Sequence, residues 1–199
     1  MENPGAAEQV VDDAIEADGA TGTITSVSRS ATHDFSKAPV ASIRLITGWG
    51  IEGDAHAGHT AQHVYIAKKD PTRANLTQVH LLPEEVFAEV AALGHDVTAG
   101  GLGENVTTRG LVLRTLPLGT RLHLGADAIV EVTGLRSPCS QINRFQKGLM
   151  KALIAKDAAD RVIRKAGIMS VVVADGVVYP DDEVRVELPA GEFIPLGTV

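Results

Sequence analysis

Residues 104–134, ENVTTRGLVLRTLPLGTRLHLGADAIVEVTG, decide the fold class of this 199-residue chain. Short apolar or alternating runs in this stretch predict four strands, at 104–107, 111–113, 120–124 and 128–134. Turn residues separate them, at Pro117-Leu118-Gly119 and at Gly125-Ala126-Asp127. Strands that recur at such short intervals are typical of a β-barrel or a β-sandwich. The stretch therefore predicts a mainly β domain of mixed α/β class.

The flanking sequence extends this β pattern and adds two helical segments. Further strands are predicted at 23–28, 40–46, 62–67, 77–82, 168–173 and 183–188. Pro83-Glu84-Glu85 predicts the start of a peripheral helix near 83–93, because proline and acidic residues favour a helix N-terminus, and Gly94 ends it. Apolar positions at helical spacing predict a second peripheral helix near 141–166, interrupted around Gly148.

The chain length suits one domain, which we place at residues 21–199. Residues 1–20 contain six acidic residues among alanines and glycines, and we expect them to form a mobile acidic tail.

The composition argues against two classes of partner. A net charge of -7 argues against nucleic acid, since phosphate binding needs a concentrated basic surface. The longest apolar runs are too short to span a membrane, no secretory signal is visible, and one cysteine suits a reducing compartment, so we expect a cytoplasmic protein. A pocket for a small anion stays possible, because five arginines fall in the third of the chain that contains Cys139: Arg109, Arg114, Arg121, Arg136 and Arg144.

Cys139 is the only cysteine, and it follows the predicted strand 128–134 directly. It has no partner for an internal disulfide, so a functional role would be that of a nucleophile, a carrier of a transferable atom or a metal ligand. A buried structural role is the other interpretation, because free cysteine is common in protein cores. Pro138 and polar neighbours such as Arg136 and Ser137 favour a partly exposed thiol.

Two other motifs offer weaker chemistry. Gly100 to Asn105 fits neither the dinucleotide pattern nor the P-loop, and predicts only a backbone concavity able to hold an oxyanion. Glycines around a run of potential metal ligands favour a loop held by Asp54 with exposed histidines over a metal site. The run consists of Asp54, His56, His59 and His63.

Two hydrolase classes can also be considered. The chain has no Gly-x-Ser-x-Gly motif, which argues against one class of serine hydrolase. A Cys–His enzyme would need His80 or His56 as the base for Cys139, and the sequence does not show their proximity.

Taken in order, several segments resemble the MOSC domain, the family named after the C-terminal domain of molybdenum cofactor sulfurases, in its stand-alone bacterial form. Gly-Glu-Asn at 103–105 and Pro-Cys at 138–139 are the most specific elements, and the resemblance covers roughly residues 22 to 189. It implies a β-barrel like the pyruvate kinase barrel domain, with the motif cysteine at a cleft. The resembling segments are 50–58, 78–82, 103–105, 118–125, 133–139, 167–168 and 175–176.

The same resemblance implies a cofactor and a set of site residues. Cys139 would carry sulfur or ligate molybdenum, and a thiolate is a soft donor that suits either. The implied cofactor is the molybdenum cofactor, whose phosphorylated pterin would suit arginines and an oxyanion-binding loop. The residues implied to line the site are Asp54, His56, Glu104, Asn105 and Arg136.

A full sulfurase also has a large pyridoxal phosphate domain, for which 199 residues leave no room. Pyridoxal phosphate would therefore act only in a separate cysteine desulfurase partner.

Three functions stay open from the sequence. The first is binding of molybdenum cofactor or transport of sulfur on Cys139, as a sulfur transferase would do. The second is molybdenum-dependent reduction of N-hydroxylated compounds with an electron-donor protein. The third is a non-catalytic barrel that binds a small anion or a protein. The sequence also leaves open the oligomeric state, and whether His56, His59 and His63 lie near Cys139.

Overall fold

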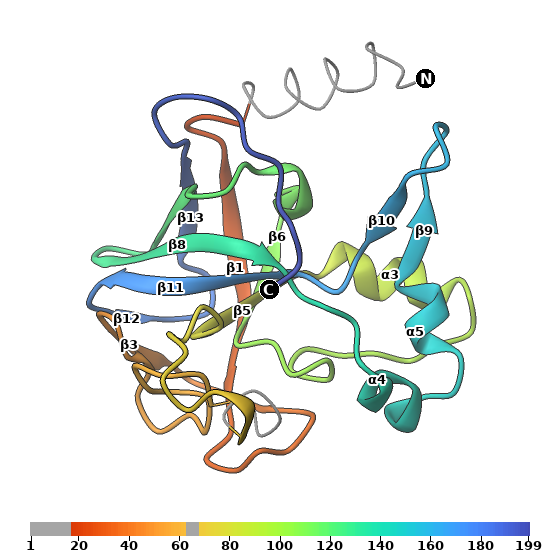
Figure 1. The fold of residues 1–199 in the computed structure, drawn as a ribbon, viewed down its shortest axis with the longest axis horizontal. Helices are drawn as coiled ribbons and strands as arrows, with labels where there is room; N and C mark the ends of the chain where they lie inside the picture. The colour runs from red at the N-terminus through yellow and green to blue at the C-terminus, as the bar shows by residue number, and fades with distance from the viewer. Residues whose placement is uncertain (1–16, 63–67) are drawn as a thin grey trace.

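The computed structural model describes residues 17–62 and 68–199, and its central feature is a closed barrel of seven strands (Figure 1). Neighbouring strands pair antiparallel except β5 and β6, which are parallel, and β1 pairs with β13 to close the barrel. The predicted mainly β barrel is therefore confirmed. The barrel strands, in pairing order, are β13 (Glu183–Glu187), β7 (Arg121–Leu124), β8 (Ala128–Leu135), β11 (Ile168–Ala174), β5 (Val79–Pro83), β6 (Val106–Arg109) and β1 (Thr21–Arg29).

Smaller elements surround the barrel. β2 (Ala38–Val40) extends the sheet beside β1, and a separate three-stranded sheet contains β12 (Gly176–Val178), β3 (Ile43–Ile46) and β4 (Gly50–Ile51). The helices are α3 (Glu85–Ala91), α4 (Ser140–Phe145), α5 (Leu149–Ala152) and the 3-10 turn η1 (Leu113–Thr115). β9 (Ile154–Lys156) and β10 (Val162–Arg164) form a hairpin on the same side of the barrel as α3 to α5 (Figure 1).

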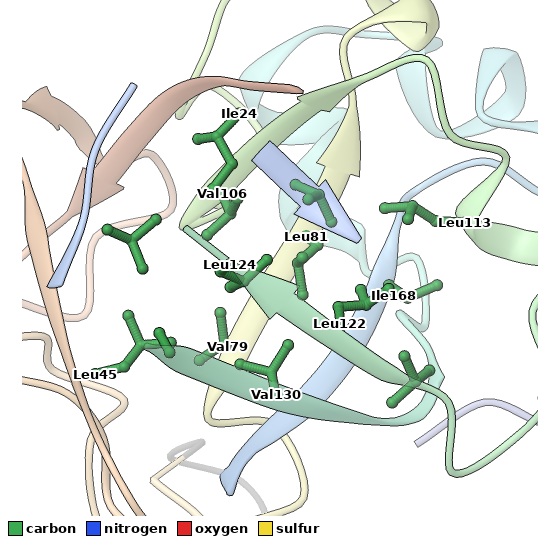
Figure 2. Close-up of a cluster of buried hydrophobic side chains, with 14 of the residues drawn as sticks. Ile24, Leu45, Val79, Leu81, Val106, Leu113, Leu122, Leu124, Val130 and Ile168 are labelled. Carbon is green, nitrogen blue, oxygen red and sulfur yellow. The ribbon is translucent and has the colours of Figure 1, made fainter. Parts of the chain in front are cut away.

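The barrel interior is filled by aliphatic side chains (Figure 2). On β8, buried and half-buried residues alternate, as expected for a strand with one face toward the core. Val130 of β8 packs in the same cluster as Leu81, Leu122 and Ile168. Each fully buried aliphatic side chain of this kind contributes about 1.5–3 kcal/mol.

A second apolar cluster attaches the helices to the outside of the barrel. Leu82 of β5 and Val86 and Val90 at the start and end of α3 pack with Ile142 of α4 and Leu149 of α5. Because this cluster holds both short helices, it also fixes the chain between the end of β8 and α4, where Cys139 lies.

The predicted helix near 83–93 corresponds to α3, but the helix near 141–166 is only partly correct. Helix ends at Ala152, and 154–164 instead forms the β9–β10 hairpin. Asp157 Oδ1 accepts hydrogen bonds from the backbone N–H groups of Ala159 and Arg161, which builds the hairpin turn. Short apolar runs fit a helix or a strand equally well by spacing, and here β-branched residues and an aspartate turn favour the strand.

Three smaller differences concern the ends of other predicted elements. The strand predicted at 111–113 is replaced by η1, and most of the strand predicted at 62–67 lies outside the described residues. Residues 17–20, included in the predicted tail, bond to β13, since Gly19 N–H donates to Val186 O at 3.0 Å. The prediction for residues 1–16 concerns positions outside the described chain. Within 17–62 and 68–199, no helix is long and apolar enough to cross a membrane.

The glycines at 100–103 allow two loops to pack backbone against backbone. A Cβ on Gly100, where φ is +78°, would lie 2.0 Å from the Lys37 carbonyl oxygen, and one on Gly103 would lie 2.5 Å from the Phe35 carbonyl oxygen. The Lys37 N–H donates to the Gly100 carbonyl at 2.9 Å. The lack of side chains at these glycines therefore allows residues 35–37 to pack closely against the loop. This close packing, and not phosphate binding, accounts for the glycines.

Gly100→Ala is expected to lower the free energy of unfolding by more than about 2 kcal/mol, because it combines left-handed backbone strain with a clash against backbone. Gly94→Ala is the matched control: its φ is +84° and nothing lies within 4 Å of the added Cβ, so strain alone costs about 1 kcal/mol. Urea denaturation of both variants measures the difference, and equal losses would contradict the close-approach argument.

Candidate functional site

A cavity of about 350 Å³ contains Cys139 and lies where four separate parts of the chain meet. These parts are the loop after β1, the loop after β4, the connection between α3 and β6, and the segment after β8. Strands β5 and β11 supply further wall residues. The wall includes Phe35, Lys37, His56, His80, Asn105, Arg136, Cys139 and Met169.

Cys139 stands between the end of β8 and the first residue of α4, and it is half-buried. Arg136 N–H donates to the Gly167 carbonyl at 3.0 Å, which continues the sheet and fixes the direction of this segment. The Cys139 Sγ lies 3.7 Å from Gln141 Oε1. Among the described residues no histidine hydrogen-bonds to Sγ, so the geometry does not favour a Cys–His hydrolase pair.

Asp54 lies behind the cavity wall and organises it. Its Oδ2 accepts hydrogen bonds from Lys37 Nζ at 2.7 Å, Asn105 Nδ2 at 3.1 Å and the Ser30 N–H at 3.3 Å. Its Oδ1 accepts from the His56 N–H at 2.9 Å and contacts His56 Nδ1 at 3.2 Å. Both carboxylate oxygens are thus committed to protein donors, and Asp54 positions the wall rather than binding a ligand.

The pKa of Asp54 reflects two opposed effects. Burial raises it, but hydrogen bonds from His56 and the charge and hydrogen bond of Lys37 outweigh burial and hold it well below its usual value. For Lys37, burial dominates and lowers the pKa of the ammonium, while Asp54 opposes the change. Asp54 therefore stays anionic and keeps a buried cation at the cavity.

Lys37 was not among the residues predicted from the sequence. It is 6% exposed, lines the cavity, and donates to Asp54. Its place depends on a contact between residues 17 positions apart in two irregular loops, for which the sequence carries no periodic signal. Phe35 and Met169 also line the cavity without having been predicted there, and so does His80, which the sequence suggested only as a possible base for Cys139.

The side chains of Glu104 and Asn105 form hydrogen bonds with other groups of the protein. Glu104 does not line the cavity: its Oε1 accepts from the Gly100 N–H at 2.6 Å and its Oε2 from the Leu102 N–H at 3.1 Å. Burial raises the pKa of the Glu104 carboxyl, against the effect of these N–H donors. Asn105 lines the cavity, but both its amide N–H groups are used, by Ser28 O and Asp54. The Gly-Glu-Asn motif thus ties the glycine loop to β1 and to Asp54.

Arg136 is the cationic group of the cavity that lacks a partner. Its Nη1 is buried without a hydrogen-bond acceptor among the described residues, and its guanidinium lies 5.8 Å from the centre of the Phe35 ring. Burial lowers the pKa of Arg136, and the charges of Cys139 and Glu104 oppose this, but a guanidinium stays protonated in proteins. A buried charged donor without an acceptor is costly, and an anionic ligand in the cavity would supply the acceptor.

The other predicted arginines lie elsewhere. Arg109 pairs with Glu84, and Arg121 lies 3.5 Å from Glu131. Arg114 and Arg144 do not line this cavity. Of the five arginines, Arg136 alone is brought to Cys139 in the described structure.

The histidines divide between the cavity and the surface. His56 lines the cavity, with its ring 5.2 Å from that of His33, whereas His59 packs on the edge of Trp49 and bonds to Gly48 O. His63 lies outside the described residues. Across 17–62 and 68–199, no group of three or more His, Cys, Asp or Glu side chains is placed to hold a metal ion.

His80 is a neutral wall residue. It is buried in β5, and burial holds the pKa of its imidazole well below the usual value. Nε2 lies 2.7 Å from the Ala166 carbonyl, so it must carry the proton and donate. The hydrogen bond from His80 Nε2 therefore joins β5 to the segment before β11.

Comparison with known proteins gives a family match and a shared fold. A model of the MOSC domain matches residues 56–185. The fold is similar to that of YuaD from Bacillus subtilis, with 23% identity, a TM-score of 0.66, and coverage of 84% of this chain and 96% of that one. It is also similar to YiiM from Geobacillus stearothermophilus, with 22% identity, a TM-score of 0.58, and coverage of 83% and 74%.

YiiM from Escherichia coli gives comparable values: 20% identity, a TM-score of 0.59, and coverage of 87% and 73%. Identities this low show a shared fold only. No curated protein sequence matches the chain significantly.

Asp54→Asn is expected to destabilise the protein by about 3–5 kcal/mol, because it leaves the buried Lys37 ammonium without its counter-ion. The pKa of Asp54 is lower in the folded than in the unfolded protein, where it is about 3.9. Its stabilising effect is therefore present above that value and is lost as pH falls toward the folded pKa.

Urea unfolding from pH 7 to pH 3 tests this, with the exposed Asp160→Asn as control. Wild type and Asp160→Asn should lose stability steeply below about pH 4, and Asp54→Asn less steeply. If the free energy of unfolding falls equally in all three proteins as the pH is lowered, protonation of Asp54 is not the cause of the loss of stability.

Proposed function

Because this chain belongs to the MOSC domain family, we propose that it binds the anionic molybdenum cofactor in the Cys139 cavity, with Cys139 Sγ as a ligand of the metal. One observation carries the proposal: the half-buried Arg136 has a buried Nη1 with no acceptor in the described structure, and it lines the same cavity as a half-buried thiol. A cation and a soft donor side by side suit a ligand that combines a soft metal with negative charge.

The residues present fit such a group. A thiolate is a soft ligand for molybdenum, and Arg136 and Lys37 would bind phosphate or other anionic oxygens of the pterin. A cavity of about 350 Å³ falls within the usual range for small-molecule sites, about 300–1,000 Å³. When bound, the cofactor supplies two-electron redox chemistry.

The chain's own residues would orient the ligand and handle protons. Burial lowers the pKa of Lys37, so its Nζ releases a proton more readily than a solvent-exposed lysine does. Asp54 holds this ammonium and the His56 imidazole on the cavity wall by direct hydrogen bonds. Phe35 and Met169 supply apolar wall that reduces contact with water.

A second candidate is sulfur transport on Cys139. It is favoured by the partial exposure of the Cys139 thiol at a cavity, where a second protein's persulfide could reach it. The Cys139 thiolate would attack the terminal sulfur of a persulfide on a cysteine desulfurase, and the sulfur–sulfur bond of the desulfurase would break. Cys139 would then carry the persulfide, and the desulfurase cysteine would leave as its thiolate. Pyridoxal phosphate would act only in that partner.

The two remaining functions depend on the same residue. A molybdenum-dependent reductase of N-hydroxylated compounds would use the cofactor site together with an electron-donor protein. A non-catalytic barrel is less well supported, because Cys139 is half-buried at a cavity rather than enclosed in the core. A cytoplasmic location is part of the proposal, since a reducing compartment keeps Cys139 available as a thiol.

Protein made in a host that synthesises molybdenum cofactor should contain near-stoichiometric molybdenum by elemental analysis, and Cys139→Ser should contain none. Ser137→Ala is the matched control, because Ser137 lines the same cavity without offering a thiol. If Cys139 carries sulfur instead, intact mass shows one added sulfur on wild type after incubation with a cysteine desulfurase and cysteine, and none on Cys139→Ser.

Iodoacetamide should alkylate Cys139 in the native protein, as expected for a half-buried thiol. Wild-type protein that gains neither metal nor sulfur, and whose thiol resists alkylation until unfolding, would overturn both forms of the proposal.

Arg136→Met should leave the free energy of unfolding within about 1 kcal/mol of wild type or raise it, because it removes a buried charge that has no partner. Retention of the cofactor should nevertheless fall about tenfold to a hundredfold, the loss expected for a hydrogen bond to a charged group. Arg144→Met is the control, since Arg144 lies outside the cavity. A variant that is destabilised yet retains the cofactor fully would assign Arg136 a structural role.

A further inference from the structure

A second cavity, of about 340 Å³, opens between the β9–β10 hairpin and the C-terminal segment. Its apolar surface includes Leu116, Phe193 and Leu196, and four consecutive residues of the hairpin, 161–164, lie along it. The hairpin stands apart from the barrel strands (Figure 1). The name hairpin groove is used for this cavity below.

The groove follows the edge of β10 rather than one of its faces. Successive residues of a strand point to opposite faces, so a cavity that touches Val162, Ile163 and Arg164 in turn must run beside the backbone. In the described chain β10 pairs with β9 alone, which leaves its other edge open. An open edge offers backbone N–H and C=O groups to an added strand.

The charge of the groove is opposite to that of the protein. Arg114, Arg161 and Arg164 line it against one acid, Asp157, whereas the whole chain carries a net charge of -7. Arg161 pairs with Asp157, but Arg114 and Arg164 have no ion-pair partner among the described residues. An extended segment with acidic side chains would complement both arginines while its backbone pairs with β10.

Consecutive residues of the chain line the groove and the Cys139 cavity. Leu135 lines the groove and Arg136, the next residue, lines the cavity. β10 leads directly into the segment that holds Arg136, since Arg136 N–H bonds to Gly167 O three residues after the end of β10. A protein seated in the groove would therefore contact Leu135, at the end of the strand that leads to Arg136 and Cys139.

We propose that the hairpin groove binds an acidic, extended segment of the protein that delivers sulfur or electrons to the Cys139 site, by strand addition to β10. This inference rests on the proposed function, which needs such a donor because the chain has one cysteine and no second thiol to supply sulfur or reducing equivalents. Val162 is 49% exposed and offers an apolar contact to the same segment.

The test uses full-length protein and a fluorescent ten-residue peptide of alternating Glu and Val, with a Lys and Val peptide of the same length as its charge control. The acidic peptide should bind with an affinity that falls with added salt, and the basic peptide should not bind. Arg114→Glu combined with Arg164→Glu should weaken binding about tenfold or more. Arg185→Glu, an exposed change on β13, should leave it unchanged.

Two measurements separate strand addition from simple charge attraction. An acidic peptide N-methylated at alternate residues keeps its charge but loses backbone donors, and it should bind about tenfold more weakly. Hydrogen exchange at the N–H groups of Val162 and Arg164, which face away from β9, should slow when the unmodified peptide binds. Equal binding of both peptides, or unchanged exchange, would overturn the proposal.

Other occupants give different results. Exchange at Val162 and Arg164 that is already slow without peptide would mean that the chain itself fills the groove. Dependence on protein concentration would then identify a second copy, and independence would identify the acidic residues 1–16 of the same chain. Either result overturns the proposed partner.

The proposed function is tested separately. Cys139→Ser should bind the acidic peptide as wild type does, so peptide binding does not depend on Cys139 chemistry. Metal or sulfur on Cys139 without peptide binding would refute the groove proposal alone. Peptide binding without metal or sulfur on Cys139 would refute the proposed function, and the donor role of the bound segment with it.

Discussion

The site depends on one buried carboxylate. Asp54 receives donors from the loop after β1, from its own loop, and from Asn105 at the start of β6. Each of these segments is irregular, and none pairs with the others as a strand does. Burying Asp54 is favourable only because five contacts compensate it, so the three segments can take no other relative positions without leaving the charge unpaired.

This constraint explains why an acidic protein has a cationic cavity. Asp54 pairs with Lys37, while Arg136 comes from a different part of the chain, the segment between β8 and α4. Lys37 forms an ion pair with Asp54, whereas Arg136 has no ion-pair partner among the described residues. The uncompensated charge lowers the stability of the empty protein, and an anionic ligand that supplies the acceptor would raise it by linkage.

Much of the barrel could be predicted from the sequence, because alternation and turn residues are local signals. β8 and the turn after β7 follow them closely. The sequence predicts helix where the β9–β10 hairpin forms, since Leu153, Ile154 and Val162 fit either period in short runs. Lys37 could not be predicted, because its burial is decided by Asp54, a residue in another loop. For Glu104 the motif is visible in the sequence, but the role of the side chain is not. Its carboxylate accepts hydrogen bonds from the loop backbone and does not line the cavity.

The closure of the barrel also sets the order in which the site can form. β1 pairs with β13, so Thr23 and Glu183, which lie 160 positions apart, are register partners. Bringing together residues so distant in sequence is slow, because the entropy of closing the loop must be lost before the contact forms. During synthesis β1 emerges first, yet this pairing must wait for β13 near the other end of the chain. The loop with Phe35 and Lys37 continues from β1, so the cavity is completed only after nearly all of the chain has left the ribosome.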